Sequence, residues 1–212
     1  IIAMPECGIG LVPDVGGSFL LTRKSKELGI YLGITGSHMK ADDAIFTNFA
    51  DFFVEEKYWE EAKSKLIKTG DTTFLNKFKR ESLNSPLKKN LRLIIDLFSI
   101  NKLSLIIKEM EMNPVFVQSV KKMLSASPLS VLTSYHMLQM PEIFLSVKEA
   151  LKIEYRFTSR AQKYTDFQEG IRSMIIDKDR NPVWKYPNIE EVPIQEVFDL
   201  LKPLSSSSEL KI

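Results

Sequence analysis

The chain has 212 residues, of which 44% are hydrophobic, and its formal net charge at pH 7 is +2. This length fits one domain, or half a domain with an extension, and the apolar content excludes a wholly disordered protein. The single cysteine, Cys7, excludes an internal disulfide. No apolar run approaches the roughly 18 residues of a membrane span, and two histidines with one cysteine form no metal-ligand pattern. We therefore expect neither a membrane partner nor a metal.

The first 55 residues predict short strands and helices around glycine-rich turns. Seven of the nine glycines lie between Gly8 and Gly36, where the backbone is expected to turn tightly. We expect a short strand and then a loop before residue 18. Helices are expected over 18–23, 25–36 and 41–47, and a strand-like segment over 50–54.

From residue 56 onward the pattern becomes helical, and no further strand is expected. The apolar residues of 91–98 repeat with the period of an amphipathic helix. Asn113 and Ser127 each precede a proline, which is typical of a helix start. Further helices are expected over 145–156 and 165–174, the second opened by a capping box.

The end of the chain predicts little regular structure. After Pro182 the sequence becomes irregular, and the serines of 205–208 mark a flexible tail. We therefore divide the chain into a first region that carries two acids (1–55), a helical region (56–204) and a flexible tail (205–212).

Two carboxylates, Glu6 and Asp14, lie eight residues apart in an otherwise apolar stretch. A carboxylate in apolar surroundings is costly unless it is paired, hydrogen-bonded or catalytic. One interpretation is a pair of catalytic acids. The other is an ordinary strand–turn–helix connection, in which the acids are solvated or Asp14 caps the next helix. Cys7 has no histidine close in sequence to activate it, so we expect it to pack rather than to react.

Several segments carry a resemblance to a known family. They are MPECGIGLVPDVGGSFLLTR (4–23), LGIYLGITG (28–36), EYR (154–156), DFQEGIR (166–172), IDKD (176–179) and PVW (182–184). Together they resemble 3-hydroxyisobutyryl-CoA hydrolase, a branch of the crotonase (enoyl-CoA hydratase/isomerase) superfamily. The first segment is shared across the superfamily, whereas the segments after residue 166 point to the hydrolase branch. The resemblance extends from residue 1 to about residue 192.

The resemblance implies an α/β fold, namely the C-terminal part of a crotonase (ββα superhelix) core followed by a mainly α-helical layer. A crotonase domain has an N-terminal half before the MPE segment. That half supplies the two backbone N–H groups of the oxyanion hole and most contacts with coenzyme A. Because residue 1 falls just before this segment, we expect that half to be missing from this chain and to be a partner of it.

The same resemblance implies the roles of the two acids. Glu6 corresponds to the catalytic glutamate, which attacks the thioester carbonyl or activates water. Asp14 corresponds to the second acid, which binds the 3-hydroxyl of the substrate or holds the water. Both acids, with Gly16 and Gly17, are implied to bind the substrate. No cofactor is implied, because coenzyme A enters only as part of the acyl-CoA substrate.

The implied reaction is hydrolysis of 3-hydroxyisobutyryl-CoA in valine catabolism, in the mitochondrion, and two alternatives remain open. Residues 57–125 carry 14 Lys or Arg against 7 Asp or Glu. This bias would suit a non-catalytic structural paralog such as a protein of the mitochondrial ribosome small subunit, the only case in which RNA contact is expected. The other alternative is an enoyl-CoA hydratase, whose two catalytic acids are usually glutamates. A homo-oligomer is compatible with each of these functions.

Some residues depart from the family's pattern, among them Asn48 and Phe52. Asn48 stands where the family usually has glycine, and asparagine tolerates the left-handed backbone conformation that a glycine adopts. Phe52 stands where the family usually has histidine, so a polar group is lost there.

Overall fold

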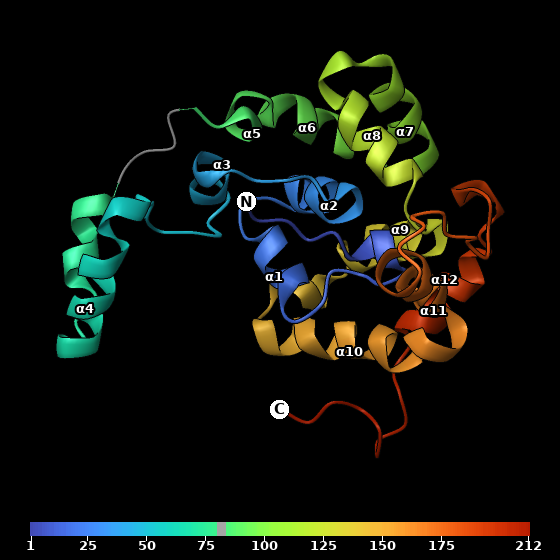
Figure 1. Ribbon diagram of the computed structural model, residues 1–212. Helices are drawn as coiled ribbons and strands as arrows, with labels where there is room; N and C mark the ends of the chain where they lie inside the picture. Colours follow the sequence, from blue (N-terminus) through green and yellow to red (C-terminus); the bar gives the residue numbers. More distant parts are fainter. Residues whose placement is uncertain (80–83) are drawn as a thin grey trace. The chain divides into compact units, whose positions relative to one another are not determined.

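Helices make up most of the computed structural model, which describes residues 1–79 and 84–212 (Figure 1). The chain forms two compact units. The first consists of Ile1–Ile2 and Met39–Leu91, and the second of Ala3–His38 and Arg92–Ile212. The family site predicted from the sequence lies in the second unit.

In the described residues of the first unit there are three α-helices. They are α3 (Ala41–Phe46), α4 (Trp59–Thr69) and α5 (Pro86–Lys89). Asp43 of α3 is buried and accepts hydrogen bonds from Ser85 Oγ at 2.6 Å and from the Leu87 N–H at 3.1 Å. These bonds attach α3 to the beginning of α5, since they satisfy donors that a helix start leaves unpaired.

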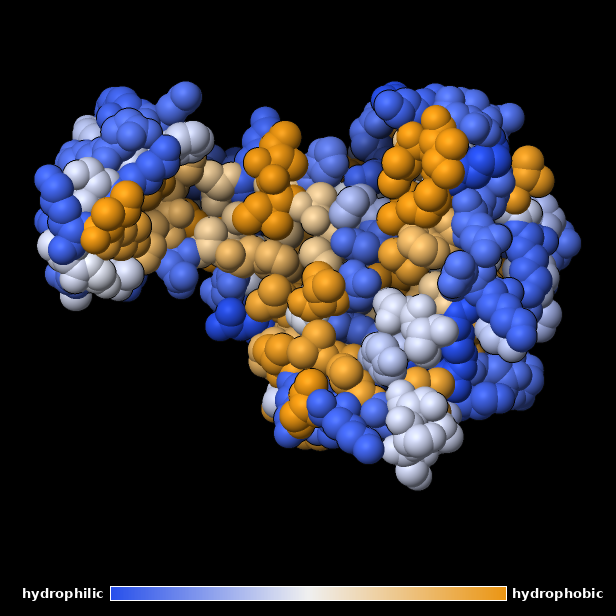
Figure 2. Space-filling model, turned by 60° about the horizontal axis from the view of Figure 1, so that its bottom comes forward, coloured by the Kyte–Doolittle hydropathy of each residue, from blue (hydrophilic) through white to orange (hydrophobic). Residues whose placement is uncertain are grey.

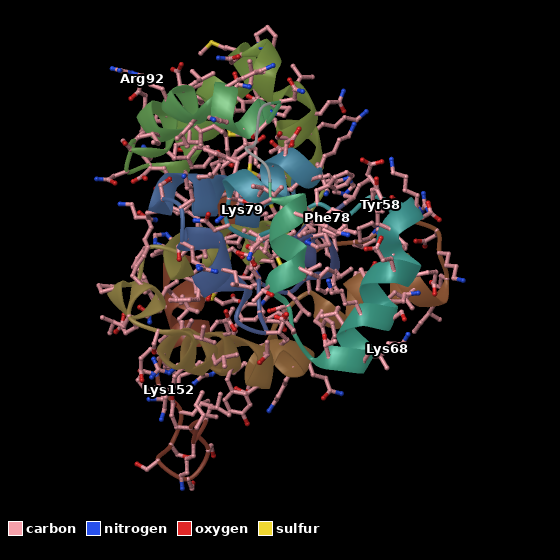
Figure 3. All side chains as sticks on the ribbon, turned by 90° about the vertical axis from the view of Figure 1, so that its left-hand side faces the viewer. Tyr58, Lys68, Phe78, Lys79, Arg92 and Lys152 are labelled. Atoms are coloured by element: carbon pink, nitrogen blue, oxygen red, sulfur yellow. The ribbon has the colours of Figure 1, made fainter. Side chains whose placement is uncertain are left out.

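Aromatic packing holds the segment around α4. The rings of Tyr58 and Phe78 are tilted by 49° to each other, with their centroids 5.4 Å apart. Figure 3 labels both residues. Trp59 Nε1 donates a hydrogen bond to the Val54 carbonyl at 2.8 Å. The prediction of a helix over 41–47 is confirmed, as is helical structure beyond residue 56.

The strand-like prediction for residues 50–54 is wrong, since no strand is formed there. A strand needs a neighbour for its backbone groups. In the described residues the only β pairing is one antiparallel bridge between Ile2 and Met39. Instead, the Ala50 N–H bonds back to the Ala44 carbonyl at 3.1 Å. Asn48 does adopt the expected left-handed conformation, with φ of 64°.

The second unit contains helices that pack around α2 and α9. Its α-helices are α1 (Gly17–Thr22), α2 (Lys26–Thr35), most of α6 (Leu91–Phe98), α7 (Leu103–Met112), α8 (Val117–Leu124), α9 (Pro128–Met137), α10 (Val147–Tyr164), α11 (Phe167–Ile171) and α12 (Ile194–Leu201). Short 3-10 turns are η1 (Glu6–Ile9), η4 (Pro114–Phe116), η5 (Pro141–Phe144) and η7 (Ile189–Glu191). A π-helical turn spans Arg172–Ile176.

Helix α2 is central because nearly all of it is apolar. Its residues from Leu28 to Thr35 are all buried, as expected for a helix without a polar face. It contacts α1, α8 and α9. The predicted bounds are confirmed: Ser25 Oγ accepts from the Leu28 N–H at 3.1 Å, and Gly36 ends the helix in the left-handed conformation.

The predicted helix starts at Asn113 and Ser127 are also confirmed. Asn113 Oδ1 accepts from the Val115 N–H at 3.0 Å, and Ser127 Oγ accepts from the Ser130 N–H at 3.1 Å. The amphipathic helix predicted over 91–98 is α6. These features depend on residues a few positions apart, which is why the sequence predicts them.

The C-terminal region is more ordered than predicted. Helix α12, buried at Val197, Leu200 and Leu201, lies in the part of the chain expected to be irregular. Further on, Glu209 pairs with Arg156 of α10 at 2.7 Å. The helix predicted over 165–174 is α11 continued by the π-helical turn.

Apolar side chains occupy the interior and also reach the surface at several places (Figure 2). None of the helices in the described residues has the length and apolar character needed to cross a bilayer.

Candidate active site

Glu6 begins the turn η1, and packing holds this turn in place. The Cys7 carbonyl accepts a hydrogen bond from the Ser127 N–H at 3.0 Å. The Cys7 side chain is 3% exposed, and its Sγ lies 3.2 Å from Ser134 Oγ. Burial raises the pKa of the Cys7 thiol to about 12. Cys7 is therefore a packing residue, as predicted, because a thiol with this pKa is not a nucleophile at neutral pH.

The carboxyl group of Glu6 is not stabilised as an ordinary surface acid. Its Oε2 atom is buried and has no hydrogen-bond partner among the described residues. Burial raises the pKa of Glu6 to about 7, and the charges of Asp14 and Glu154 also raise it. The Glu6 backbone N–H and the Lys122 ammonium act in the opposite direction. Glu6 therefore exists in both protonation states near pH 7, which suits a general base or a nucleophile.

A cavity of about 500 Å³ lies beside Glu6. Its apolar lining includes Ile34 of α2 and Met174 of the π-helical turn, and its cationic lining comes from Lys122 and Arg180. This volume lies within the usual range for sites that bind small molecules. The cavity brings residues from widely separated parts of the sequence to one carboxyl group.

Lys122 is held at this cavity by the end of α2. Its Nζ donates a hydrogen bond to the backbone carbonyl of Gly36, the residue that follows α2. Burial lowers the pKa of Lys122, and attraction to Glu6 raises it. The sequence did not single out Lys122; its only signal was the basic bias of residues 57–125.

Asp14 lies in the turn that precedes α1. Its backbone carbonyl accepts from the Gly17 N–H at 2.7 Å. Burial raises the pKa of the Asp14 carboxyl, and its charge raises the pKa of Glu6. The two predicted acids therefore interact electrostatically, although Asp14 is not part of the lining of the cavity. Nor does the Asp14 side chain cap α1. The N-cap residue of this helix is Gly16, and the N–H group of Ser18 donates to Glu154 of α10 instead.

The predicted substrate-binding glycines form the turn after Asp14. Gly16 has φ of 84°, in the left-handed region that glycine adopts without strain. Gly17 is the first residue of α1 and is buried. Neither lines the cavity beside Glu6, so the structure places them in the backbone that supports Asp14.

Glu154 of α10 is the acid that reaches this turn, and the sequence did not identify it as a site residue. Its side chain is 2% exposed. Oε2 accepts from the Gly16 N–H at 2.8 Å, and Oε1 accepts from the Ser18 N–H at 3.0 Å and from Ser18 Oγ. A signal was present, because Glu154 lies on the apolar stripe of α10 formed by Ala150, Ile153, Phe157 and Ala161. An acid on such a stripe is buried and requires partners.

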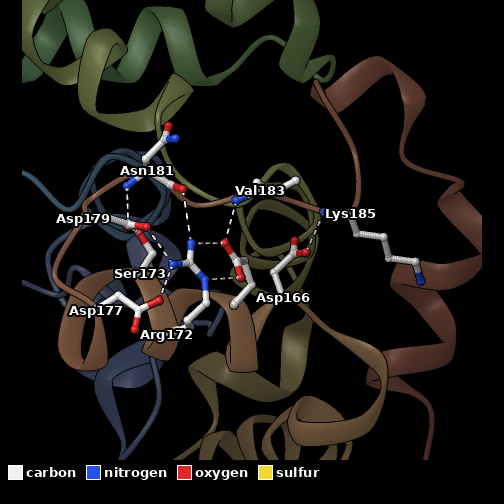
Figure 4. Close-up of polar contacts among 9 residues, drawn as sticks. Asp166, Arg172, Ser173, Asp177, Asp179, Asn181, Val183 and Lys185 are labelled. Atoms are coloured by element: carbon white, nitrogen blue, oxygen red, sulfur yellow. Dashed lines mark hydrogen bonds and ion pairs between the residues drawn. The ribbon is translucent and has the colours of Figure 1, made fainter.

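Arg172 anchors the loop that contributes Arg180 to the cavity (Figure 4). Its guanidinium pairs with Glu169 at 2.7 Å, Asp177 at 2.7 Å and Asp179 at 2.6 Å. Hydrogen bonding to Arg172 holds the pKa of both Glu169 and Asp179 at about 2. The loop is therefore fixed by several charged contacts to one side chain, which favours a defined wall for the cavity.

Metal binding finds no support in the described parts of the chain. Over residues 1–79 and 84–212, no group of three or more His, Cys, Asp or Glu side chains is arranged to hold a metal ion.

Comparisons with known proteins show the family to which the chain is similar. The model of the family described as Enoyl-CoA hydratase/isomerase matches residues 1–201. Two similar proteins, from Dictyostelium discoideum and Gallus gallus, are named 3-hydroxyisobutyryl-CoA hydrolase, mitochondrial. They are 32% and 30% identical over 223 and 225 residues, and each alignment covers 100% of this chain and 58% of the relative. The chain thus spans little more than half the length of these relatives.

Two crystal structures are similar over 99% of the chain. One is an enoyl-CoA hydratase from Rhodobacter sphaeroides 2.4.1, with a TM-score of 0.90, 39% identity and 61% of that chain covered. The other is a carnitinyl-CoA dehydratase from Mycobacterium thermoresistibile, with a TM-score of 0.87, 28% identity and 60% of that chain covered.

Proposed function

Because the chain belongs to the enoyl-CoA hydratase/isomerase family, we propose that it is part of an enzyme that hydrolyses an acyl-CoA thioester. The resemblance inferred from the MPE segment and the C-terminal segments is thereby confirmed. The described helices are those of a portion of a crotonase-family protein. We further propose that a ββα core completes the fold.

The proposed substrate is 3-hydroxyisobutyryl-CoA, which the names of the similar proteins contain. Their names also contain the word mitochondrial, which supports a mitochondrial location for this protein. Hydrolysis of this thioester would place the protein in valine catabolism.

One observation carries the proposal, namely the carboxyl group of Glu6 at the cavity. Its buried Oε2 lacks a partner, and its pKa of about 7 makes it more basic than an ordinary glutamate. A thioester is a good acyl donor, since the thiolate that leaves needs little protonation. A carboxylate of this kind therefore suffices to start the reaction.

Two routes use Glu6 and give the same products. In the first, Glu6 attacks the thioester carbonyl carbon, the C–S bond breaks and the thiolate departs. The acyl group is then joined to Glu6 as an anhydride, which water hydrolyses. In the second, Glu6 takes a proton from a water molecule that attacks the carbonyl, and the departing thiolate receives a proton. Both routes release coenzyme A and 3-hydroxyisobutyrate.

Asp14 and the oxyanion donors complete the proposed site. Asp14 would bind the 3-hydroxyl group, and a buried polar group with this duty rejects substrates that lack the hydroxyl. The tetrahedral oxyanion needs N–H donors, each typically worth a factor of about 10²–10³ in rate. By resemblance, those donors belong to the N-terminal half of a crotonase domain, which is the proposed partner of this chain.

The test is release of coenzyme A from 3-hydroxyisobutyryl-CoA by the full-length gene product, followed with a thiol reagent. Glu6→Gln should abolish turnover, and Asp14→Asn should reduce it. Hydration of crotonyl-CoA, measured in parallel, distinguishes a hydratase. Folded full-length protein that releases no coenzyme A above background would refute the proposal.

A further inference from the structure

Glu154 makes three hydrogen bonds to the turn that carries Asp14, across 136 to 138 residues of sequence. The donors are the Gly16 N–H, the Ser18 N–H and Ser18 Oγ. Among the described residues no lysine or arginine forms an ion pair with Glu154, so its burial is offset by these donors. Burying an acid without a paired cation costs more free energy than the capping of a short helix requires.

The turn that Glu154 holds has an unfavourable backbone. Val15, directly after Asp14, has φ of 51°, and Gly16 has φ of 84°. A β-branched residue in the left-handed region is strained. The Val15 side chain is 82% exposed, so its own packing does not compensate for that strain. Such a conformation persists only where its surroundings determine it.

We propose that Glu154 is the positioning residue for Asp14: by binding the backbone on the C-terminal side of the strained turn, it fixes the direction of the Asp14 carboxyl at the Glu6 site. This inference rests on the proposed function, because it assigns Glu154 a part in recognition of the substrate hydroxyl. Glu6, Asp14 and Glu154 thus form a set of three acids that interact electrostatically, in which Glu154 holds the turn that carries Asp14.

Only a carboxylate fits all three donors. Both oxygens of Glu154 accept N–H groups, so an amide in its place would turn an NH2 group toward either Gly16 or Ser18. One backbone N–H would lose its acceptor, and the turn would be free to relax. Glu154→Gln keeps the size of the side chain, and therefore tests the hydrogen bonds rather than the packing.

The first measurement compares two substrates, 3-hydroxyisobutyryl-CoA and isobutyryl-CoA, with the full-length protein. In Glu154→Gln, the preference in kcat/KM for the hydroxylated substrate should fall by about 10- to 100-fold, as expected for a misplaced polar group. Ser18→Ala removes one of the three donors and should cause a smaller loss. Glu149→Gln, on the same helix and paired with Lys152 rather than with the turn, should keep the preference.

A purely structural role for Glu154 predicts a different result. The folded fraction would fall, and the rates for both substrates would fall together, so the preference would not change. That result would overturn the proposal. Equal rates on both substrates by the wild-type protein would also overturn it, since Asp14 would then have no hydroxyl to recognise.

The second measurement needs no turnover and separates this proposal from the proposed function. Carboxyl resonances of Glu6 and Asp14 are followed by NMR as the pH is varied, in the wild type, Glu154→Gln and Glu149→Gln. The charged groups that act on Glu6 are Asp14, Glu154 and Lys122. Glu154→Gln should lower the pKa of Glu6 from about 7 and shift the Asp14 resonance. If both are unchanged, Glu154 does not act on the two acids, whether or not the protein hydrolyses thioesters.

Discussion

Lys122 Nζ donates a hydrogen bond to the Gly36 carbonyl, which fixes a cation at the edge of the cavity that contains Glu6. The two residues come from the helix α8 and from the end of the helix α2. The negative charges of Asp14 and Glu154 raise the pKa of Glu6, and the positive charge of Lys122 lowers it. Lys122 therefore opposes the effects that raise the pKa of Glu6.

Lys122→Met should raise the pKa of Glu6 above about 7, because it removes a positive charge that lowers it. Under the proposed function the rate of hydrolysis rises with pH as Glu6 ionises, so the midpoint of the kcat/KM profile should move to higher pH in the variant. The size of the shift gives the strength of the interaction between Lys122 and Glu6, since one pH unit corresponds to about 1.4 kcal/mol. Lys121→Met is the matched control, because Lys121 precedes Lys122 on α8 but is exposed. A midpoint equal to that of the control would contradict the prediction.

Glu6→Gln should stabilise the protein above neutral pH. The pKa of Glu6 in the folded state is about 7, against an ordinary value of 4.5, so the folded state binds more protons between these pH values. The free energy of unfolding of the wild type therefore falls as the pH rises from about 4.5 to about 7. Glutamine carries no charge and does not incur this loss.

The difference is measured by urea unfolding of the two proteins at pH 4 and at pH 8. We expect Glu6→Gln to gain on the order of 1 kcal/mol over the wild type at pH 8, after allowance for solvent screening of a half-buried group. At pH 4 the gain should vanish. If the two proteins differed in unfolding free energy by the same amount at both pH values, ionisation of Glu6 would not destabilise the folded protein.

The sequence predicted Glu6 and Asp14 but not Lys122 and Glu154, for a physical reason. The helix caps at Asn113 and Ser127 depend on residues within a few positions, so the pattern alone indicates them. Glu154 and Lys122 reach the site only through the packing of α10 and α8. They lie far from Glu6 along the chain, so no local sequence pattern indicates that they are near it. The resemblance included the segment with Glu154 but gave it no role.

Two wrong predictions have a similar origin. The segment 50–54 has strand composition, but a strand forms only beside a partner, which no short pattern specifies. Helix α12 was missed because prolines before it suggested an irregular chain. Its apolar positions Ile194, Val197, Leu200 and Leu201 do follow a helical period, and Pro193 stands at its start, where proline is tolerated.

Gly170→Ala should disturb Glu6 from a distance. A Cβ atom added at Gly170 would lie 2.3 Å from the Ile9 carbonyl oxygen, and the backbone of η1 would have to move. Because Glu6 begins the same turn, we expect a loss of kcat together with about 1–3 kcal/mol of stability. Gly8→Ala is the control for stability, since a Cβ there meets nothing within 4 Å. Equal unfolding free energies for the two variants would contradict the close packing of η1 on α11.

Asp166→Ala should destabilise the second unit by about 1–3 kcal/mol for each donor left unpaired. The Asp166 side chain is 5% exposed, and it accepts from Ser127 Oγ at 2.5 Å and from the Lys185 N–H at 2.8 Å. Asp166→Asn should cost less, because its amide oxygen still accepts from Lys185 while its NH2 group donates to the serine hydroxyl.

The comparison is made by urea unfolding against Asp199→Ala, which removes an exposed acid paired with Lys202 at 3.0 Å. Surface pairs contribute at most about 1 kcal/mol, so this control should remain close to the wild type. Ser127→Ala should be as destabilising as Asp166→Ala, because Ser127 also caps α9 through the Ser130 N–H. If Asp166→Ala were no less stable than Asp199→Ala, the buried bond between Asp166 and Ser127 would not hold α9 to the C-terminal segment.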